Sequence, residues 1–326
     1  MTSRAALAAA RSHLYVLFGR LFRHGVTPDL LSDLRELPEL AAHLADPFDA
    51  DAAAAAHYRL LHFEVFPHES IFLHPDSLLG GEIAAAVHDF YQQAGFAPPA
   101  DALPDHLGLE LALLSFLTGA EAAAANDAPV WQDWQRHFLD QHLLRWLPAL
   151  VQAMGRQGHP FYTTLADLTL ELALDHRAAL GNDLPAAAPV FCLPPPPDLL
   201  ADAKTGLAEI ADYLLTPAFS GIYLSRDEIR RLAQAQGLPS GFGHRRRMLA
   251  DLLTTASVYD GLDRLLAALQ ADLAGRQQDL AALATAHPGL APLLRPWQQQ
   301  MAHTRQVLER LLAALPTLSP LAIARP

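Results

Sequence analysis

Carboxylate and imidazole side chains lie close together in the leucine-rich segment Pro104–Leu111 and could form a binding site. Asp105 follows a proline and is placed to cap a helix. His106 and Glu110 are four residues apart, so they share one face of that helix. Leucines cover nearly the whole circumference around them, which predicts a buried helix. Because buried polar groups need partners or mark a site, two interpretations stay open, and the residues alone favour a capped helix with a satisfied histidine over a ligand site.

Basic side chains cluster in Arg245, Arg246 and Arg247, directly after Gly241-Phe242-Gly243-His244. Glycines before an arginine-bearing helix start could present backbone N–H groups and positive charge to a phosphate or another anion. The alternative, which we favour, is an exposed turn whose arginines pair with nearby acids or with the acidic first half of the chain. Anion binding at these three residues is therefore the weaker of the two hypotheses.

Residue patterns typical of enzymes and metalloproteins are missing from the sequence. The chain has 16 histidines, but no His-x-x-x-His or Glu-x-x-His spacing that would put two metal ligands on one helix face. It has a single cysteine, Cys192, and no phosphate-binding loop, dinucleotide fingerprint or nucleophile elbow. The sequence thus predicts no catalytic residue, no metal site and no resident cofactor.

The elements that must position these residues are helices, because alanine and leucine dominate and strand-like alternation is scarce. The helical windows are 12–22, 52–63, 78–94, 105–125, 131–154, 162–180, 199–215, 225–236, 245–256, 260–286 and 292–315. Four consecutive prolines, 194–197, interrupt them and favour an extended connector. We predict an all-α fold with a helical domain at 1–188, a proline-rich linker at 189–198 and an accessory helical domain at 199–326.

Charge divides at the same boundary. Residues 1–190 carry 23 acidic and 10 basic side chains, whereas residues 191–326 carry 12 acidic and 13 basic ones. An acidic domain attracts basic ligands and makes nucleic acid an unexpected partner; the alternative is that the charge only keeps an alanine-rich protein soluble. No apolar run approaches the roughly 20 residues of a membrane span, and the apolar run Ala5–Ala10 is too short for a signal peptide. We therefore expect a cytoplasmic protein.

Several segments together resemble the TorD/DmsD/NarJ family of redox-enzyme maturation chaperones. Pro104-Asp105-His106-Leu107, followed by Glu110-Leu111 and Phe116-Leu117, is similar to the signature helix of that family. Segments similar to other family blocks occur in the same order, and the resemblance extends over about residues 10–180. These further segments are Tyr15-x-x-Phe18 with Leu21-Phe22, Phe66–Leu73 with Gly81-Glu82, Phe90-Tyr91 with Gly95-Phe96, Phe138–Pro148, and Phe161–Ala166.

The resemblance implies an all-helical cytoplasmic chaperone that binds the twin-arginine leader, or the cofactor-free catalytic subunit, of a molybdopterin oxidoreductase and assists cofactor insertion before export. Carried over by position, the peptide-binding residues would be Phe66, Pro67, His68, Glu69, Ser70, Phe72, Pro104, Asp105, His106 and Glu110. Their carboxylates could accept guanidinium groups, and the phenylalanines could receive the apolar part of a leader. The family often has an aromatic residue where this chain has His68.

Other functions and partners stay open beside this one. A helical assembly subunit retained in a finished redox complex is the first alternative, and a helical-bundle hydrolase is the second. Residues 199–326 exceed the single domain usual in the family, so their role is not assigned. The sequence leaves open whether the protein is a monomer or a homodimer, and whether it contacts molybdopterin guanine dinucleotide during insertion.

Overall fold

The computed structural model describes residues 4–124, 127–181, 191–201 and 205–315. Within these ranges the chain forms helices joined by turns and loops and has no β-strand, which confirms the predicted all-α fold. The extended pairing that does occur is an isolated antiparallel bridge between His68 and His106. Over the same ranges, no helix combines the length and the apolar character that crossing a membrane requires.

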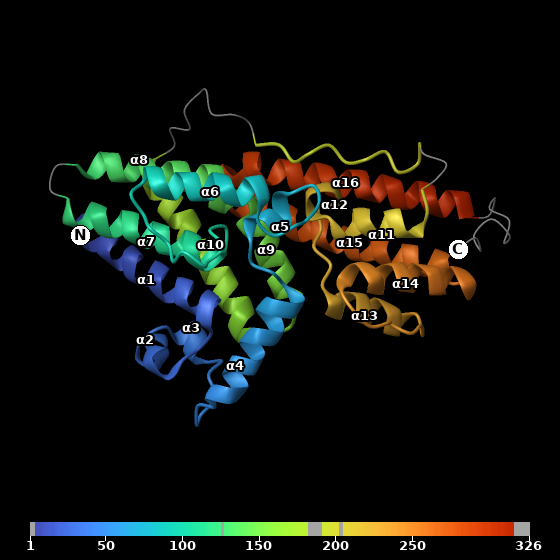
Figure 1. Cartoon of the computed structure of the whole chain (residues 1–326), viewed down its shortest axis with the longest axis horizontal. Helices are drawn as coiled ribbons and strands as arrows, with labels where there is room; N and C mark the ends of the chain where they lie inside the picture. Colours follow the sequence, from blue (N-terminus) through green and yellow to red (C-terminus); the bar gives the residue numbers. More distant parts are fainter. Residues whose placement is uncertain (1–3, 125–126, 182–190, 202–204, 316–326) are drawn as a thin grey trace. The chain divides into compact units, whose positions relative to one another are not determined.

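The chain divides into two compact units (Figure 1), each described here by itself. Unit 1 comprises Met1–Ile71 and Leu78–Pro189, and unit 2 comprises Phe72–Ser77 and Val190–Pro326. The short segment Phe72–Ser77 thus belongs to unit 2, although the chain on both sides of it belongs to unit 1. The domain and linker boundaries expected from the sequence stay a prediction, and residues 182–190, 202–204 and 316–326 of those parts lie outside the described residues.

Unit 1 consists of helices of very different lengths, most of which lie at the predicted positions. They are α1 (Arg4–His24), η1 (Pro28–Leu30), α2 (Leu31–Arg35), α3 (Pro38–Ala41), α4 (Ala50–Arg59), η2 (Leu60–Glu64), α5 (Glu69–Leu73), α6 (Gly81–Gln93), α7 (Leu107–Ala123), α8 (Ala128–Phe138), η3 (Leu139–Leu143), α9 (Leu144–Gly155) and α10 (Pro160–Ala179). Two of them, η2 and η3, are π-helical turns. Helix α5 starts in unit 1 and continues into the segment assigned to unit 2.

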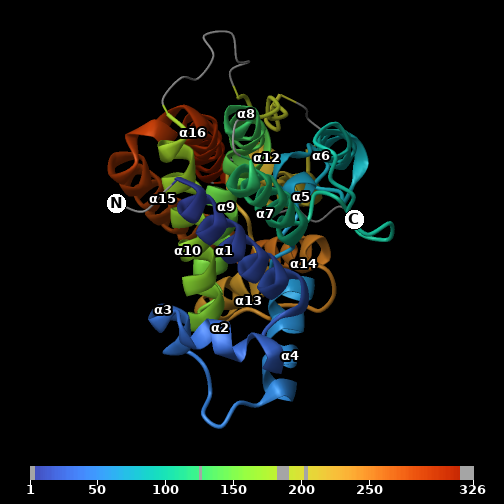
Figure 2. The same cartoon turned by 90° about the vertical axis from the view of Figure 1, so that its left-hand side faces the viewer.

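Helices α1 and α7 lie side by side in unit 1 (Figure 2). Glycines make this close approach possible, because a Cβ on Gly108 would lie 2.6 Å from Gly19 O and 2.4 Å from Arg23 Cγ. A Cβ on Gly19 would likewise lie 2.9 Å from Gly108 O. The leucines of α7 are buried on all sides, as predicted. This packing holds the start of α7, and with it the Asp105–Glu110 region, in the centre of unit 1.

A buried hydrogen-bonded relay crosses the same unit. Tyr15 Oη lies 2.9 Å from His176 Nδ1, and His176 Nε2 lies 2.8 Å from Gln135 Oε1. Gln135 Nε2 donates to Leu117 O and to Glu121 Oε2. Because the amide oxygen of Gln135 can only accept, His176 carries its proton on Nε2, and its Nδ1 accepts from the tyrosine. Burial lowers the pKa of His176 to about 3, so the imidazole is neutral in the folded chain.

Unit 2 is also helical. Its elements are α11 (Leu207–Leu215), α12 (Pro217–Ser220), α13 (Arg226–Ala235), α14 (Arg245–Val258), α15 (Leu262–Ala286), η4 (Pro288–Leu290) and α16 (Ala291–Ala314). Residues 191–198, which include the four prolines, have no regular secondary structure. Ser225 caps α13 in a reciprocal capping box with Glu228.

A buried cation organises the centre of unit 2. Arg276 is 1% exposed and donates to Tyr223 O, to Glu228 and to Asp272. Tyr223 in turn stacks on Phe72, with ring centroids 5.3 Å apart. Charge and hydrogen bonds are therefore matched around the guanidinium, as a buried ion pair requires.

Candidate functional site

Two segments that are far apart in the sequence meet in unit 1 and form the centre of the candidate site. Leu107 N donates to Pro67 O over 2.9 Å, and Glu69 N donates to Asp105 O over 2.9 Å. The rings of His68 and His106 lie edge to face, with centroids 4.8 Å apart. The structure thus brings together the two blocks that the sequence suggested separately.

Asp105 links these two segments, but it is not the helix cap that we expected. His106 caps α7 instead, because its Nδ1 accepts a hydrogen bond of 3.0 Å from Gly108 N. Asp105 is fully buried; its Oδ2 accepts from Ser70 N over 3.0 Å, and its Oδ1 lies 3.5 Å from His68 Nδ1. Burial alone would raise the pKa of Asp105, but the nearby imidazole of His68 and the hydrogen bond from Ser70 outweigh it and lower the pKa. The carboxylate therefore holds the second segment in place.

The cap role of His106 requires a neutral imidazole, because a protonated ring has no free nitrogen to accept the hydrogen bond. Burial, followed by the nearby charges of His68 and Arg23, lowers the pKa of His106 to about 3. His106 is accordingly an acceptor in the folded chain at neutral pH. Its role is to fix the start of α7.

Glu110, one helical turn further along α7, and Glu69 of α5 form a second group of acids. Glu110 is fully buried and accepts a hydrogen bond of 3.2 Å from Trp146 Nε1. Glu69 is 3% exposed, and its Oε2 lies 3.2 Å from His142 Nδ1. Burial, together with the negative charges of Glu69 and Asp105, raises the pKa of Glu110 well above its usual value. Glu110 therefore favours its protonated form, whereas Asp105 favours the carboxylate.

Tyr91 closes the site on the side of α6. Its hydroxyl donates to Pro104 O over 2.7 Å, which fixes the proline of the signature segment. Burial and the nearby carboxylates of Glu110, Glu69 and Asp105 raise the pKa of Tyr91 well above its usual value. The phenol is thus a permanent hydrogen-bond donor next to the acids.

Both π-helical turns of unit 1 adjoin the site. The turn η2 ends at Glu64, and Val65 connects it to the segment Phe66–Ser70. The turn η3 carries His142. A π-helical turn inserts an extra residue into a helix and occurs frequently at functional sites. Here η3 sets the register that directs the imidazole of His142 to Glu69.

The predicted peptide-binding residues are not all equivalent in the structure. Pro67, Glu69, Ser70, Asp105 and Glu110 are buried, whereas Phe66, His68, Pro104 and His106 are half-buried. Phe72 belongs to unit 2, where it stacks on Tyr223. The side chains of His68 and His142 are each 12% exposed, so solvent reaches the two imidazoles that face Asp105 and Glu69. Which of these residues contact a peptide stays a prediction.

Sequence reasoning gives no role to three residues that complete the site, namely Tyr91, His142 and Trp146. His142 and Trp146 lie in a block that resembles the family, and Tyr91 lies in another. Tyr91 and Trp146 could have been named as candidates from their residue types, since a buried phenol or indole needs a hydrogen-bond partner. The partners themselves, Pro104 O and Glu110, could not be read from the sequence.

The three consecutive arginines of unit 2 contact groups of their own unit. Arg245 donates to Leu224 O and lies over the ring of Tyr223, 4.3 Å from its centroid. Arg246 pairs with Asp212, and Arg247 Nε lies 3.5 Å from Asp251 Oδ2. Arg246 and Arg247 thus pair with acids of their own unit, whereas Arg245 contacts a backbone carbonyl and an aromatic ring. Anion binding stays a prediction.

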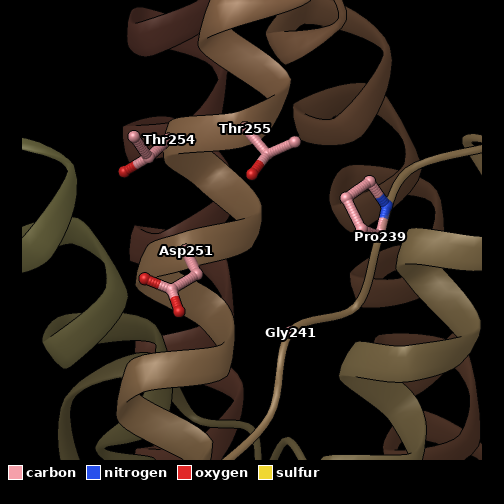
Figure 3. Close-up of a pocket in the computed structure, with 5 residues that line it drawn as sticks. All are labelled: Pro239, Gly241, Asp251, Thr254 and Thr255. Atoms are coloured by element: carbon pink, nitrogen blue, oxygen red, sulfur yellow. The ribbon is translucent and has the colours of Figure 1, made fainter.

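An open hollow of about 290 Å³ lies beside α14. Asp251, Thr254 and Thr255 line it from the helix, and Pro239 and Gly241 line it from the preceding loop (Figure 3). Throughout the described ranges, no three His, Cys, Asp or Glu side chains are arranged to hold a metal ion.

Comparison with known proteins confirms the resemblance. Residues 27–152 match the family model described as nitrate reductase delta subunit. The chain is 35% identical over 85 residues to a selenate reductase assembly chaperone protein of Thauera selenatis, covering 25% of this chain and 44% of that protein. It is 28% identical over 122 residues to a probable Tat proofreading chaperone DmsD of Haemophilus influenzae, covering 36% of this chain and 55% of that protein.

The match covers only part of each protein. The chain spans about half the length of the curated relatives it matches. The matching residues 27–152 include the two segments of the candidate site as well as His142 and Trp146. No solved structure matches the chain.

Proposed function

We propose that this chain is a cytoplasmic maturation chaperone without catalytic activity. Residues 27–152 match the family model described as nitrate reductase delta subunit, and part of the chain is similar to two proteins named as chaperones. Its client is the precursor of a molybdenum-containing redox enzyme, and its ligand is the twin-arginine leader of that precursor. By holding the leader, the protein delays export until the cofactor has been inserted.

One observation carries this proposal, the gathering of Glu69, Asp105 and Glu110 within the matching residues. Carboxylates are the groups that pair with guanidinium ions in bidentate geometry. The half-buried Phe66 lies at the start of the same segment and offers apolar surface for the residues that follow the arginines in a leader. The net negative charge of residues 1–190 adds a long-range attraction for a basic peptide.

A second candidate is an assembly subunit that remains in the finished enzyme complex. The description of the matching family model, which names a subunit, favours it. The two candidates differ in what they bind. A chaperone binds a precursor that still carries its leader, whereas a retained subunit is found with the mature enzyme.

Calorimetric titration of the full chain with a synthetic twin-arginine leader tests the peptide site. Glu69→Gln removes one negative charge from the cluster with little change in shape, so we expect at least tenfold weaker binding. Glu171→Gln is the matched control, because Glu171 is exposed on α10. We also expect tighter binding at low salt, since mobile ions screen charge attraction. Equal affinity of the two variants, or an affinity that does not change with salt, would exclude the acidic cluster as the binding site.

A further inference from the structure

The carboxyl groups of the candidate site are not equally supplied with hydrogen-bond donors. Asp105 Oδ2 accepts from Ser70 N, and its Oδ1, which has no hydrogen-bond donor among the described residues, faces the imidazole of His68 at 3.5 Å. Glu69 Oε2 lies 3.2 Å from His142 Nδ1. Glu110 accepts from Trp146 at Oε2, but no donor of the described residues reaches its Oε1. A fully buried carboxylate oxygen without a donor is costly. Glu110 Oε1 gains a hydrogen-bond partner if it carries a proton and donates a hydrogen bond to Glu69.

The surroundings of Glu110 support this protonated state. Titratable or charged groups from several elements face Glu110 or Glu69. They are Asp105 in the segment before α7, Tyr91 on α6, His142 on η3 and Arg145 on α9, in addition to the two glutamates themselves. Two of these are acids that act directly on Glu110, and Arg145 acts on Glu69. Two adjacent buried carboxyls rarely ionise together, and one of them keeps its proton.

A cation that enters the cluster changes this balance. A guanidinium within about 4–6 Å of a carboxyl favours the ionised form of that carboxyl. Its planar fork can donate to two carboxylates at once, which supplies Glu110 Oε1 with the donor that it lacks. The imidazole of His142, which is 12% exposed and lies on a π-helical turn, is the group that the incoming cation displaces from Glu69.

We propose that binding of a guanidinium at this cluster releases a proton from Glu110 to solvent, so that peptide binding is coupled to pH. The neutral acid becomes a carboxylate, the arginine keeps its charge, and the released proton goes to the buffer. This inference rests on the proposed function in one respect, the choice of a cationic leader as the ligand. It adds that the site is a proton-exchange site and that its occupancy responds to pH.

Calorimetry of the full chain at pH 7 with a twin-arginine peptide, in phosphate and in Tris, measures the released protons from the dependence of heat on the buffer. We expect about one proton released per bound peptide and an affinity that rises up to about tenfold per pH unit. Glu110→Gln keeps an oxygen for Trp146 Nε1 and an amide that donates to Glu69, so the chain should fold and bind without releasing a proton. His142→Asn should still release it.

Two outcomes would overturn the inference, namely a wild-type heat that does not depend on the buffer, or equal proton release from Glu110→Gln. Loss of the release in His142→Asn alone would assign the proton to the histidine and would also overturn it. If the peptide does not bind at all, the proposed function fails. Infrared spectroscopy of the chain without peptide then tests separately whether Glu110 is protonated. A protonated-carboxyl band at pH 7 that disappears in Glu110→Gln supports the inference, and its absence from the wild type refutes it.

Discussion

The backbone N–H of Ser70 donates to Asp105 Oδ2 over 3.0 Å, and this hydrogen bond joins two parts of the chain that are 35 residues apart. It runs beside the bridge between His68 and His106. The carboxylate therefore acts as a clamp between the segment Phe66–Ser70 and the start of α7. Since Asp105 is fully buried, the clamp is a structural element of the candidate site in the ligand-free chain.

Replacement of Asp105 tests this clamp. Asp105→Ala leaves Ser70 N without its acceptor inside the fold, so we expect the free energy of unfolding to fall by about 1–3 kcal/mol. Asp105→Asn keeps an acceptor oxygen and should cost less than the alanine variant. The measurement is urea denaturation, with Asp175→Asn, an exposed residue on α10, as the control. An Asp105→Ala variant as stable as the wild type would show that the clamp contributes nothing.

Close packing of α1 against α7 leads to a prediction about Gly108. A Cβ at this position meets Gly19 O at 2.6 Å, so Gly108→Ala should lower the free energy of unfolding by about 1–3 kcal/mol. Gly155→Ala is the control, because the Cβ added at the end of α9 meets only Thr163 Cγ2 at 4.0 Å. Thermal unfolding followed by circular dichroism compares the two variants. A similar midpoint for both would contradict the packing argument.

The buried His176 makes stability depend on pH. Its pKa is about 3 in the folded chain and about 6.5 in the unfolded one, so the unfolded state takes up a proton first as the pH falls. Its contribution to stability is complete above pH 6.5 and decreases by about 1.4 kcal/mol per pH unit below it. Glu110, with a raised pKa, acts in the opposite direction and loses its contribution as the pH rises.

Comparison of variants isolates the contribution of His176. Between pH 6.5 and pH 4.5 the free energy of unfolding of His176→Gln should fall less steeply than that of the wild type. The difference between the two slopes should be about 1.4 kcal/mol per pH unit. His13→Gln, at an exposed position of α1, should keep the wild-type slope. Denaturant unfolding at a series of pH values gives both slopes. Parallel curves for His176→Gln and the wild type would mean that His176 titrates normally.

Arg276 in unit 2 gives a prediction about a buried ion pair. Removing its guanidinium leaves Glu228 buried without its cation, so Arg276→Ala should lower the free energy of unfolding by about 3–5 kcal/mol. The pair between Arg247 and Asp251 is exposed, and Arg247→Ala should change the same quantity by less than about 1 kcal/mol. Equal losses in the two variants, measured by calorimetric unfolding, would contradict this difference.

Most of the helical fold could be predicted, because helix formers, prolines and capping residues act locally. The windows 245–256 and 260–286 differ from α14 and α15 by only two residues at one end. The short helices α2, α3, α5 and α12 were not predicted, because five residues or fewer show no periodicity. The π-helical turns were missed for a related reason, since an inserted residue interrupts the helical period only locally.

The candidate site was predictable in its residue types and not in its connections. The signature segment and the segment Phe66–Ser70 were both named, but their pairing depends on tertiary packing that no local pattern encodes. Asp105 was expected to cap α7 because it follows a proline, and the chain uses the next residue, His106, instead. Once Asp105 accepts from Ser70, it is no longer available to the helix.

Affinity capture of the full chain from its native host tests the central claim most directly. Mass spectrometry of the captured protein should identify a redox-enzyme precursor whose twin-arginine leader is still attached, in the cytoplasmic fraction. Glu69→Gln should capture several-fold less of it than Glu171→Gln does. Capture of the mature enzyme instead, with the chain as a stoichiometric subunit of the exported complex, would contradict the chaperone function.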